Sequence, residues 1–173
     1  MIKKGIIRIL EFIPLSTFLI LQRVCDDRWR EIFLICAFLA VAVLVYFHII
    51  HRILNRLNLG INYYLIVACL VNLSGFKPLN DFIQNIRGMG LIISIIITGI
   101  ITFFFSKYRF IPLDTSDDTI VIKRSLYLLL ATILCGVFML AGNYIFHFHI
   151  VFIEIIPFVV LFTFQGILMK KPR

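Results

Sequence analysis

A single carboxylate, Glu154, stands in an otherwise apolar run of residues 150–169 near the end of the chain. A charged side chain inside a bilayer is costly, so it is usually paired, faces protein or water, or serves a function. His147 and His149 precede this run directly, and Asn143 lies about one helical turn before them. A carboxylate near these groups could bind a metal, relay protons or bind a cationic ligand.

The same cluster has a purely structural interpretation. Glu154 could accept a hydrogen bond from a neighbouring helix, for instance from Asn143 or Tyr144, and so hold the helices together. The spacing of Glu154 from His147 and His149 matches no metal motif such as H-E-x-x-H. We therefore expect no metal, no cofactor and no catalytic residue, and both interpretations of Glu154 are carried forward.

Two further pairs have spacings that suit a helix face. Arg8 and Glu11 are three residues apart and can face each other. They would form either an ion pair lining a path or an interfacial pair at the start of a helix. His48 and His51 have the same spacing near the end of another apolar run. Because no third or fourth ligand is near them in the sequence, we interpret them as interfacial residues beside lipid headgroups.

The composition places all of these residues in a membrane protein. Of 173 residues, 61% are hydrophobic and 15% are charged. Soluble domains are roughly half apolar and about a quarter charged. The net charge of +8 comes from residues in short links between apolar runs, where Lys and Arg set topology and contact lipid headgroups. We therefore expect membrane lipids, and no nucleic acid, as partners.

Six apolar runs approach the roughly 20 residues that a bilayer core requires. They cover residues 6–22, 31–50, 59–76, 88–105, 125–146 and 150–169, each within a few residues. The runs are continuous rather than alternating, which predicts helices. The sequence thus predicts an all-α, polytopic transmembrane bundle in one integral membrane domain, residues 1–173. No internal repeat is apparent.

The distribution of Lys and Arg predicts the orientation. One set of links carries Lys3, Lys4, Arg8, Arg52, Arg56, Lys107, Arg109, Lys123, Arg124, Lys170, Lys171 and Arg173. The other set carries Arg23, Arg28, Arg30, Lys77 and Arg87. The positive-inside rule then places both termini in the cytoplasm. The longest link, Ser106–Arg124, is expected to be a solvated loop without a core of its own.

Two stretches resemble a known family. Glu11-Phe12-Ile13-Pro14-Leu15 stands where that family has a Phe-Leu-Pro-Leu-like stretch in its first helix. Leu134-Cys135-Gly136, followed by Ala141-Gly142-Asn143-Tyr144-Ile145, is similar to its penultimate helix. With the spacing of the helices, this pattern resembles the intracellular septation protein A family of small bacterial inner-membrane proteins. The resemblance implies a role in envelope organisation or division, exerted through protein partners without catalysis.

The expected function is accordingly that of a non-enzymatic inner-membrane protein that works with other membrane proteins. A bacteriocin or colicin-type immunity protein has the same size, charge and polytopic character. A small transporter or channel with Glu154 in its path is a third hypothesis, against which the missing repeat and missing pairs of broken helices count. A lipid-modifying enzyme using His147, His149 and Glu154 at the outer leaflet is the fourth.

Overall fold

The computed structural model describes residues 4–25, 28–106, 109–111, 118–144 and 150–169, apart from the side chains of residues 4–8, 87, 144 and 150–152. Within these ranges every regular element is an α-helix. The helices are α1 (Lys4–Val24), α2 (Trp29–Ile49), α3 (Arg56–Ser74), α4 (Lys77–Phe105), α5 (Asp118–Tyr144) and α6 (Ile150–Leu168). The predicted all-α fold is therefore confirmed for the described residues.

Each predicted apolar run lies within one of these helices or overlaps it closely, but two helices begin earlier than predicted. α4 starts at Lys77 rather than near residue 88, with a proline in its first turn, where the missing N–H costs nothing. α5 starts at Asp118 rather than near residue 125. Hydropathy marks the segment that suits lipid, whereas backbone hydrogen bonding continues through polar turns beyond it. The predicted run 88–105 is confirmed as the part of α4 that is long and apolar enough to cross a membrane, and the polar turns before it extend the same helix.

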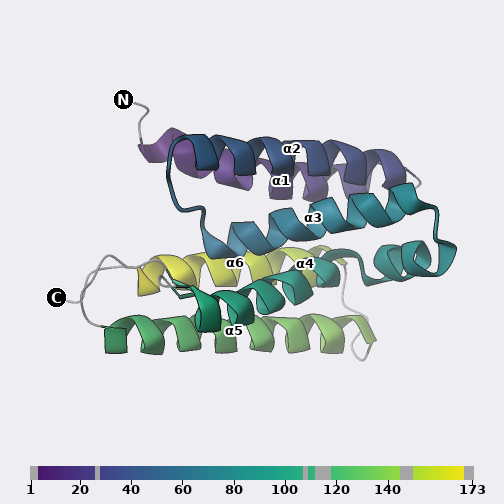
Figure 1. Ribbon diagram of the computed structural model, residues 1–173. Helices are drawn as coiled ribbons and strands as arrows, with labels where there is room; N and C mark the ends of the chain where they lie inside the picture. Colours follow the sequence, from purple (N-terminus) through teal and green to yellow (C-terminus); the bar gives the residue numbers. More distant parts are fainter. Residues whose placement is uncertain (1–3, 26–27, 107–108, 112–117, 145–149, 170–173) are drawn as a thin grey trace.

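Consecutive helices run antiparallel, and α3 lies at the centre of the bundle (Figure 1). It packs most extensively on α4, then on α2, and also contacts α1. α5 and α6 pack on each other, and α5 also covers α4. α1 begins and α6 ends at the same end of the bundle (Figure 1). We call this the Glu11 end and the opposite one the Glu154 end.

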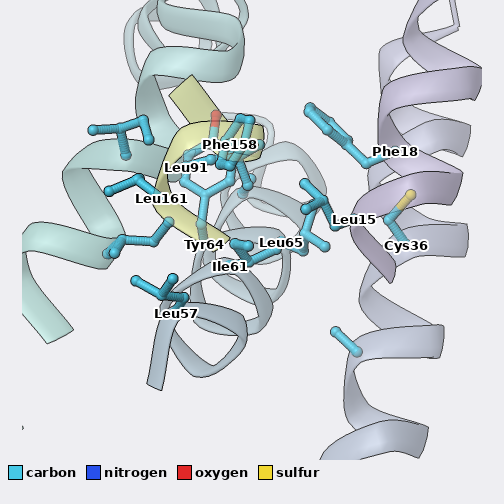
Figure 2. Close-up of a cluster of buried hydrophobic side chains, with 14 of the residues drawn as sticks. Leu15, Phe18, Cys36, Leu57, Ile61, Tyr64, Leu65, Leu91, Phe158 and Leu161 are labelled. Carbon is cyan, nitrogen blue, oxygen red and sulfur yellow. The ribbon is translucent and has the colours of Figure 1, made fainter. Parts of the chain in front are cut away.

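The apolar core surrounds α3 on both sides. Figure 2 shows Phe18 of α1 and Cys36 of α2 on one side, and Leu91 of α4 and Phe158 of α6 on the other, around Tyr64. All five side chains are buried. Lipid tails are as apolar as these side chains, so close packing rather than exclusion of water is what favours their contact in a membrane.

A glycine permits the close contact between α3 and α4. A methyl group at Gly60 would lie 2.8 Å from the Cα atom of Ile95. At the same crossing, Ser94 Oγ donates a 2.7 Å hydrogen bond to the Gly60 carbonyl oxygen. Small residues and hydroxyl hydrogen bonds of this kind are the usual means by which membrane helices approach closely.

The link between α4 and α5 differs from the solvated loop that we expected. Phe110 and Ile111 are fully buried, and the Phe110 ring lies against Gly99 of α4. Ser125 Oγ accepts a 3.1 Å hydrogen bond from the Ile111 backbone N–H. The link therefore contributes to the core, while the acidic residues 112–117 lie outside the described residues.

The helices have the length and surface of membrane spans. Four of them are long and apolar enough to cross a bilayer: α2, α3, Gly88–Phe105 of α4 and Asp118–Asn143 of α5. Large apolar side chains such as Phe38, Phe105 and Leu134 are exposed on the outside of the bundle. A surface of this kind suits lipid better than water. The chain is a helical bundle with the character of an integral membrane protein.

Candidate functional site

The predicted carboxylate is buried and joins the last helix to the first. Glu154 of α6 is 4% exposed, and its Oε2 atom accepts a 2.7 Å hydrogen bond from Gln22 Nε2 of α1. A hydrogen bond to an ionised group is stronger than one between neutral groups, especially away from water. Gln22 was not anticipated as the donor. Tyr144, one of the two donors that we considered, has its side chain outside the described set.

Two glycines of α4 lie at this site, one beside the carboxylate and one beside the Tyr64 ring. A methyl group at Gly88 would lie 3.0 Å from Glu154 Oε1, so the carboxylate rests directly on the α4 backbone. Two residues later, a methyl group at Gly90 would lie 2.2 Å from the Tyr64 ring. Tyr64 of α3 is also close enough to Glu154 for an electrostatic interaction. Four helices thus meet around one carboxyl group.

A small cavity opens beside Glu154. Its volume is about 190 Å³, and its polar lining consists of Glu154, Asn85 and Asn143. Both asparagines are exposed, so the cavity reaches the surface at the Glu154 end. Asn143 was a predicted member of the site, and the structure places it in the same cavity as Glu154. The remaining predicted members, His147 and His149, lie outside the described residues.

α1 and α6 carry the same sequence motif, which we call the Glu–Pro–Gln motif. It consists of Glu11, Ile13, Pro14 and Gln22 in α1 and of Glu154, Ile156, Pro157 and Gln165 in α6. Its Glu and Gln are eleven residues apart, which is close to three helical turns and about 16 Å, so both lie on one helix face. Each proline removes one backbone hydrogen bond. Four shared positions are a short match between two helices, and the expectation that the chain holds no internal repeat stays a prediction.

The two copies of the motif lie on helices that run in opposite directions. Between them lies an apolar groove of about 380 Å³. It is lined by Phe12, Leu15, Ser16 and Leu19 of α1 and by Ile155, Phe158, Val159, Phe162 and Thr163 of α6. The first four lining residues named for each helix lie at the same distances in sequence from the Glu of the motif. The Phe12 and Phe162 rings meet across this groove, with their centroids 4.5 Å apart.

At the Glu11 end, two amide side chains at the start of α3 contact the motif, one in α1 and one in α6. Asn58 Nδ2 donates a 3.2 Å hydrogen bond to Glu11 Oε2. Asn55 and Gln165 exchange two hydrogen bonds of 2.7 Å through their side-chain amides. Glu11 therefore contacts α3 inside the bundle rather than lying only at its surface. The side chain of Arg8, its predicted partner, is outside the described set.

α3 also carries a buried amide that no side chain satisfies. Asn62 is 1% exposed, and neither its oxygen nor its nitrogen has a hydrogen-bond partner among the described residues. Asn58 Oδ1, one turn earlier, is likewise buried without a partner. An unsatisfied amide in a low-dielectric interior is costly. The two asparagines extend the polar row from the Glu11 end toward the middle of the bundle.

The second predicted pair lies apart from these groups. His48 and His51 are exposed where α2 ends, and His51 has a left-handed backbone with a φ of 50°. Across the described residues, no three His, Cys, Asp or Glu side chains are grouped as a metal site would require.

The sequence reasoning missed most of the partners of the two carboxylates: Gln22, Asn58, Tyr64 and Gly88, together with the Asn55–Gln165 pair. One signal could have revealed the pairing. The spacing of Glu and Gln is the same in the first and last apolar runs, and Glu precedes Pro by three residues in both. A comparison of these two runs would have revealed this shared spacing.

The described residues form an all-α bundle with the character of an integral membrane protein, in which α1 and α6 run antiparallel. One carboxylate, Glu154, is buried near one end, and Glu11 is partly buried near the other. Comparison of the chain with protein-family models, curated protein sequences and solved structures gave no match.

Proposed function

We propose that this chain is a small membrane transporter for a cationic solute or for protons, and that Glu154 and Glu11 are the two charged positions along its path. The observation that carries the proposal is the Glu–Pro–Gln motif, which occurs once in α1 and once in α6, two helices that run in opposite directions (Figure 1). In secondary transporters, inverted repeats and helices interrupted at corresponding positions surround the substrate site.

The difference between the two ends supports this function. Glu154 lines a cavity that reaches the surface, whereas Glu11 is joined to Asn58 and has the Asn55–Gln165 pair beside it. A transporter must expose its site to one side of the membrane at a time. In the second arrangement Glu11 would face a cavity and Glu154 would be enclosed.

The same proposal includes a topology. In it, α1 and α6 complete six spans in a bacterial inner membrane, and both termini lie in the cytoplasm. Arg56, Arg109, Lys123 and Arg124 all belong to the Glu11 end, which the positive-inside rule assigns to the cytoplasmic side. The cavity beside Glu154 then opens to the outside of the cell.

Flux through purified protein tests the function. The chain is reconstituted into liposomes containing a pH-sensitive dye, and a membrane potential or a gradient of a small amine is imposed. We expect the wild-type chain to move protons or amine at least tenfold faster than empty liposomes. We expect Glu154→Gln and Glu11→Gln each to abolish this difference, because each removes one charged position of the path.

Gly166→Ala is the matched control, because a methyl group there meets no atom within 4 Å and the site is untouched. Its flux should equal that of the wild-type chain. Wild-type flux no greater than that of empty liposomes, or full flux through Glu154→Gln, would contradict a transport function.

The groove between α1 and α6 favours a second function, that of a non-enzymatic envelope protein related to the intracellular septation protein A family. The groove is apolar, and its lining includes Ser16 and Thr163, which are exposed on the outside of the bundle. Small hydroxyl residues at an apolar surface suit the docking of another transmembrane helix. Under this proposal the occupant is a helix of a partner membrane protein.

A photo-crosslinking residue at Ser16 tests the second function in living cells. We expect a discrete crosslinked product of defined mass. The same residue at Leu134, which is 68% exposed on α5, is the control and should yield only lipid adducts. Equal products at both positions, or none at Ser16, would exclude a specific partner in the groove.

A further inference from the structure

We infer that the first part of α4, residues 77–87, lies in the bilayer interface at the Glu154 end and that its apolar side contacts phospholipid. We call these residues the α4 extension. α4 has 29 residues, which is about 44 Å of helix, whereas the hydrocarbon core of a bilayer is about 30 Å thick. The part that is apolar enough to cross a membrane is Gly88–Phe105. The α4 extension therefore lies outside the hydrocarbon core, and this inference does not depend on a transport function.

The α4 extension presents large apolar side chains on its surface. Leu79 is 40% and Phe82 is 56% exposed, and Phe76, directly before the helix, is 60% exposed. Residues three apart in sequence are neighbours on a helix surface, so these three side chains form one apolar side. Exposed apolar groups gathered on one side are unfavourable in water and mark a contact with protein or membrane.

The opposite side of the α4 extension is polar. Lys77 and Asp81 are exposed, and Gln84 is half-buried. With 3.6 residues per turn, all three lie on the side of the helix opposite Leu79. A helical segment with one apolar and one charged side is too polar to cross the hydrocarbon core, and such segments lie in the plane of the membrane interface.

The apolar side of the extension continues into the outer side of the membrane-crossing part of α4. Ile93 follows Phe82 by eleven residues, which is close to three helical turns, so both lie on the same side. The exposed apolar residues of this stripe are Phe76, Leu79, Phe82, Ile93, Ile97, Ile100 and Phe104. Because the stripe runs on without a break in direction, the phospholipid that covers it in the span also covers it in the extension.

The α4 extension is fixed to the bundle at a defined depth. Ile83 is 6% exposed and belongs to the apolar core. Gly75 ends α3 in a left-handed conformation, with a φ of 71°, and α4 begins beside this turn at the Glu154 end (Figure 1). Phe82 precedes Gly88 by six residues, or about 9 Å along the helix axis. This distance places Phe82 at the level of the headgroups, whereas Ile97 lies near the middle of the span.

Quenching of a single tryptophan by lipid measures this contact. The full chain is reconstituted into phosphatidylcholine vesicles whose acyl chains are brominated either near the headgroup or near the bilayer centre. Trp29, the only tryptophan, is replaced by Phe, and a new tryptophan is placed at Phe82, Ile97 or Asp81. We expect the shallow bromines to quench Phe82→Trp about twofold more strongly than the deep ones, and Ile97→Trp to show the reverse order.

Asp81→Trp is the matched control, because it changes the adjacent residue on the polar side. Aqueous acrylamide should quench it about twofold more strongly than Phe82→Trp, since the polar side faces water. Circular dichroism identifies the folded variants, and Leu79→Trp, on the same apolar side, replaces Phe82→Trp if the latter does not fold.

Three results would overturn the inference. Stronger quenching of Phe82→Trp by the deep bromines would place the α4 extension in the hydrocarbon core. Quenching by acrylamide without quenching by bromine would place it in water. Protection from both quenchers would show that protein, such as a second copy of the chain, covers the apolar side. None of these measurements depends on flux, so a failure of the transport proposal leaves the inference standing.

Discussion

The hydrogen bond between Gln22 and Glu154 connects the first helix to the last, and its strength depends on its surroundings. Both residues are buried, with Gln22 6% and Glu154 4% exposed. In a water-poor interior, a charged acceptor strengthens such a bond, and loss of one partner leaves the other unsatisfied. The same residue can therefore serve both as an interhelical bridge and as a binding group, which are the two interpretations that the sequence left side by side.

Substitutions at Glu154 should separate the contribution of its hydrogen bond to stability from the contribution of its charge. We expect Glu154→Leu to lower the free energy of unfolding by about 1–2 kcal/mol, because the Gln22 amide loses its acceptor inside the bundle. Glu154→Gln retains an amide oxygen that can accept the same bond, so its loss should be less than half as large. Unfolding in mixed micelles followed by circular dichroism measures both. Equal losses would show that charge, rather than the hydrogen bond, stabilises the contact.

Gly90 should tolerate no side chain, whereas Gly166 should accept one. A methyl group at Gly90 would lie 2.2 Å from the Tyr64 ring. Overpacking of this kind costs about 1–3 kcal/mol, and we expect Gly90→Ala to unfold earlier by that amount. Gly166→Ala places a methyl group in open space in α6 and should be neutral or stabilising by up to about 1 kcal/mol. Identical stability of the two variants would contradict the contact at Gly90.

α3 is the central helix of the bundle. It lies between the α1–α2 pair and α4 (Figure 1), and it carries the amides that reach α1 and α6. Asn55 also caps the helix, since its Oδ1 accepts a 3.0 Å hydrogen bond from the Leu57 backbone N–H. One side chain thus fixes both where α3 begins and how it meets α6.

A double-mutant cycle measures the connection between α3 and α6. Asn55→Ala should cost more than Gln165→Ala, because it also removes the cap, which is worth about 1 kcal/mol. The two changes should be non-additive, with a coupling energy of about 0.6–1.7 kcal/mol, the range found for interhelical hydrogen bonds in membranes. The control cycle pairs Asn55→Ala with Gly166→Ala. Additive losses in the first cycle would mean that the reciprocal amide pair contributes nothing.

At the scale of the whole molecule, the basic residues of the Glu11 end also complete helix termini. Arg109 Nη1 donates a 2.8 Å hydrogen bond to the Phe103 carbonyl near the end of α4. Arg124 Nη1 donates to the Leu168 carbonyl at the end of α6. Free carbonyls at a helix C-terminus attract positive charge. The same charges that orient the chain in a membrane therefore stabilise its helix ends.

Labelling of cysteine tests the proposed orientation. Cys25 lies just after α1 and is partly exposed, at the end that we assign to the outside of the cell. A membrane-impermeant maleimide should label intact cells that express the wild-type chain, and Cys25→Ser should lose this label. Lys123→Cys in the Cys25→Ser background should react only after permeabilisation. The opposite pattern would invert the topology.

Some features of the fold follow from local composition and could be predicted from the sequence. The six apolar runs, the helical character and the importance of Glu154 each depend on residues close together in the chain. The starts of α4 and α5 could not be placed, because polar turns continue a helix without any change in hydropathy. The burial of Phe110 and Ile111 was missed for a related reason: it depends on Gly99, in a different element.

The sequence by itself determined which segments prefer lipid and that one carboxylate lies deep within the last of them, because transfer from water to lipid depends on each residue and its near neighbours. The tertiary structure decided which partners that carboxylate meets. Gln22 is 132 positions away in the chain, and nothing in the local sequence brings α1 against α6. The two helices meet through side chains, at the hydrogen bond between Gln22 and Glu154 and where the Phe12 and Phe162 rings lie 4.5 Å apart.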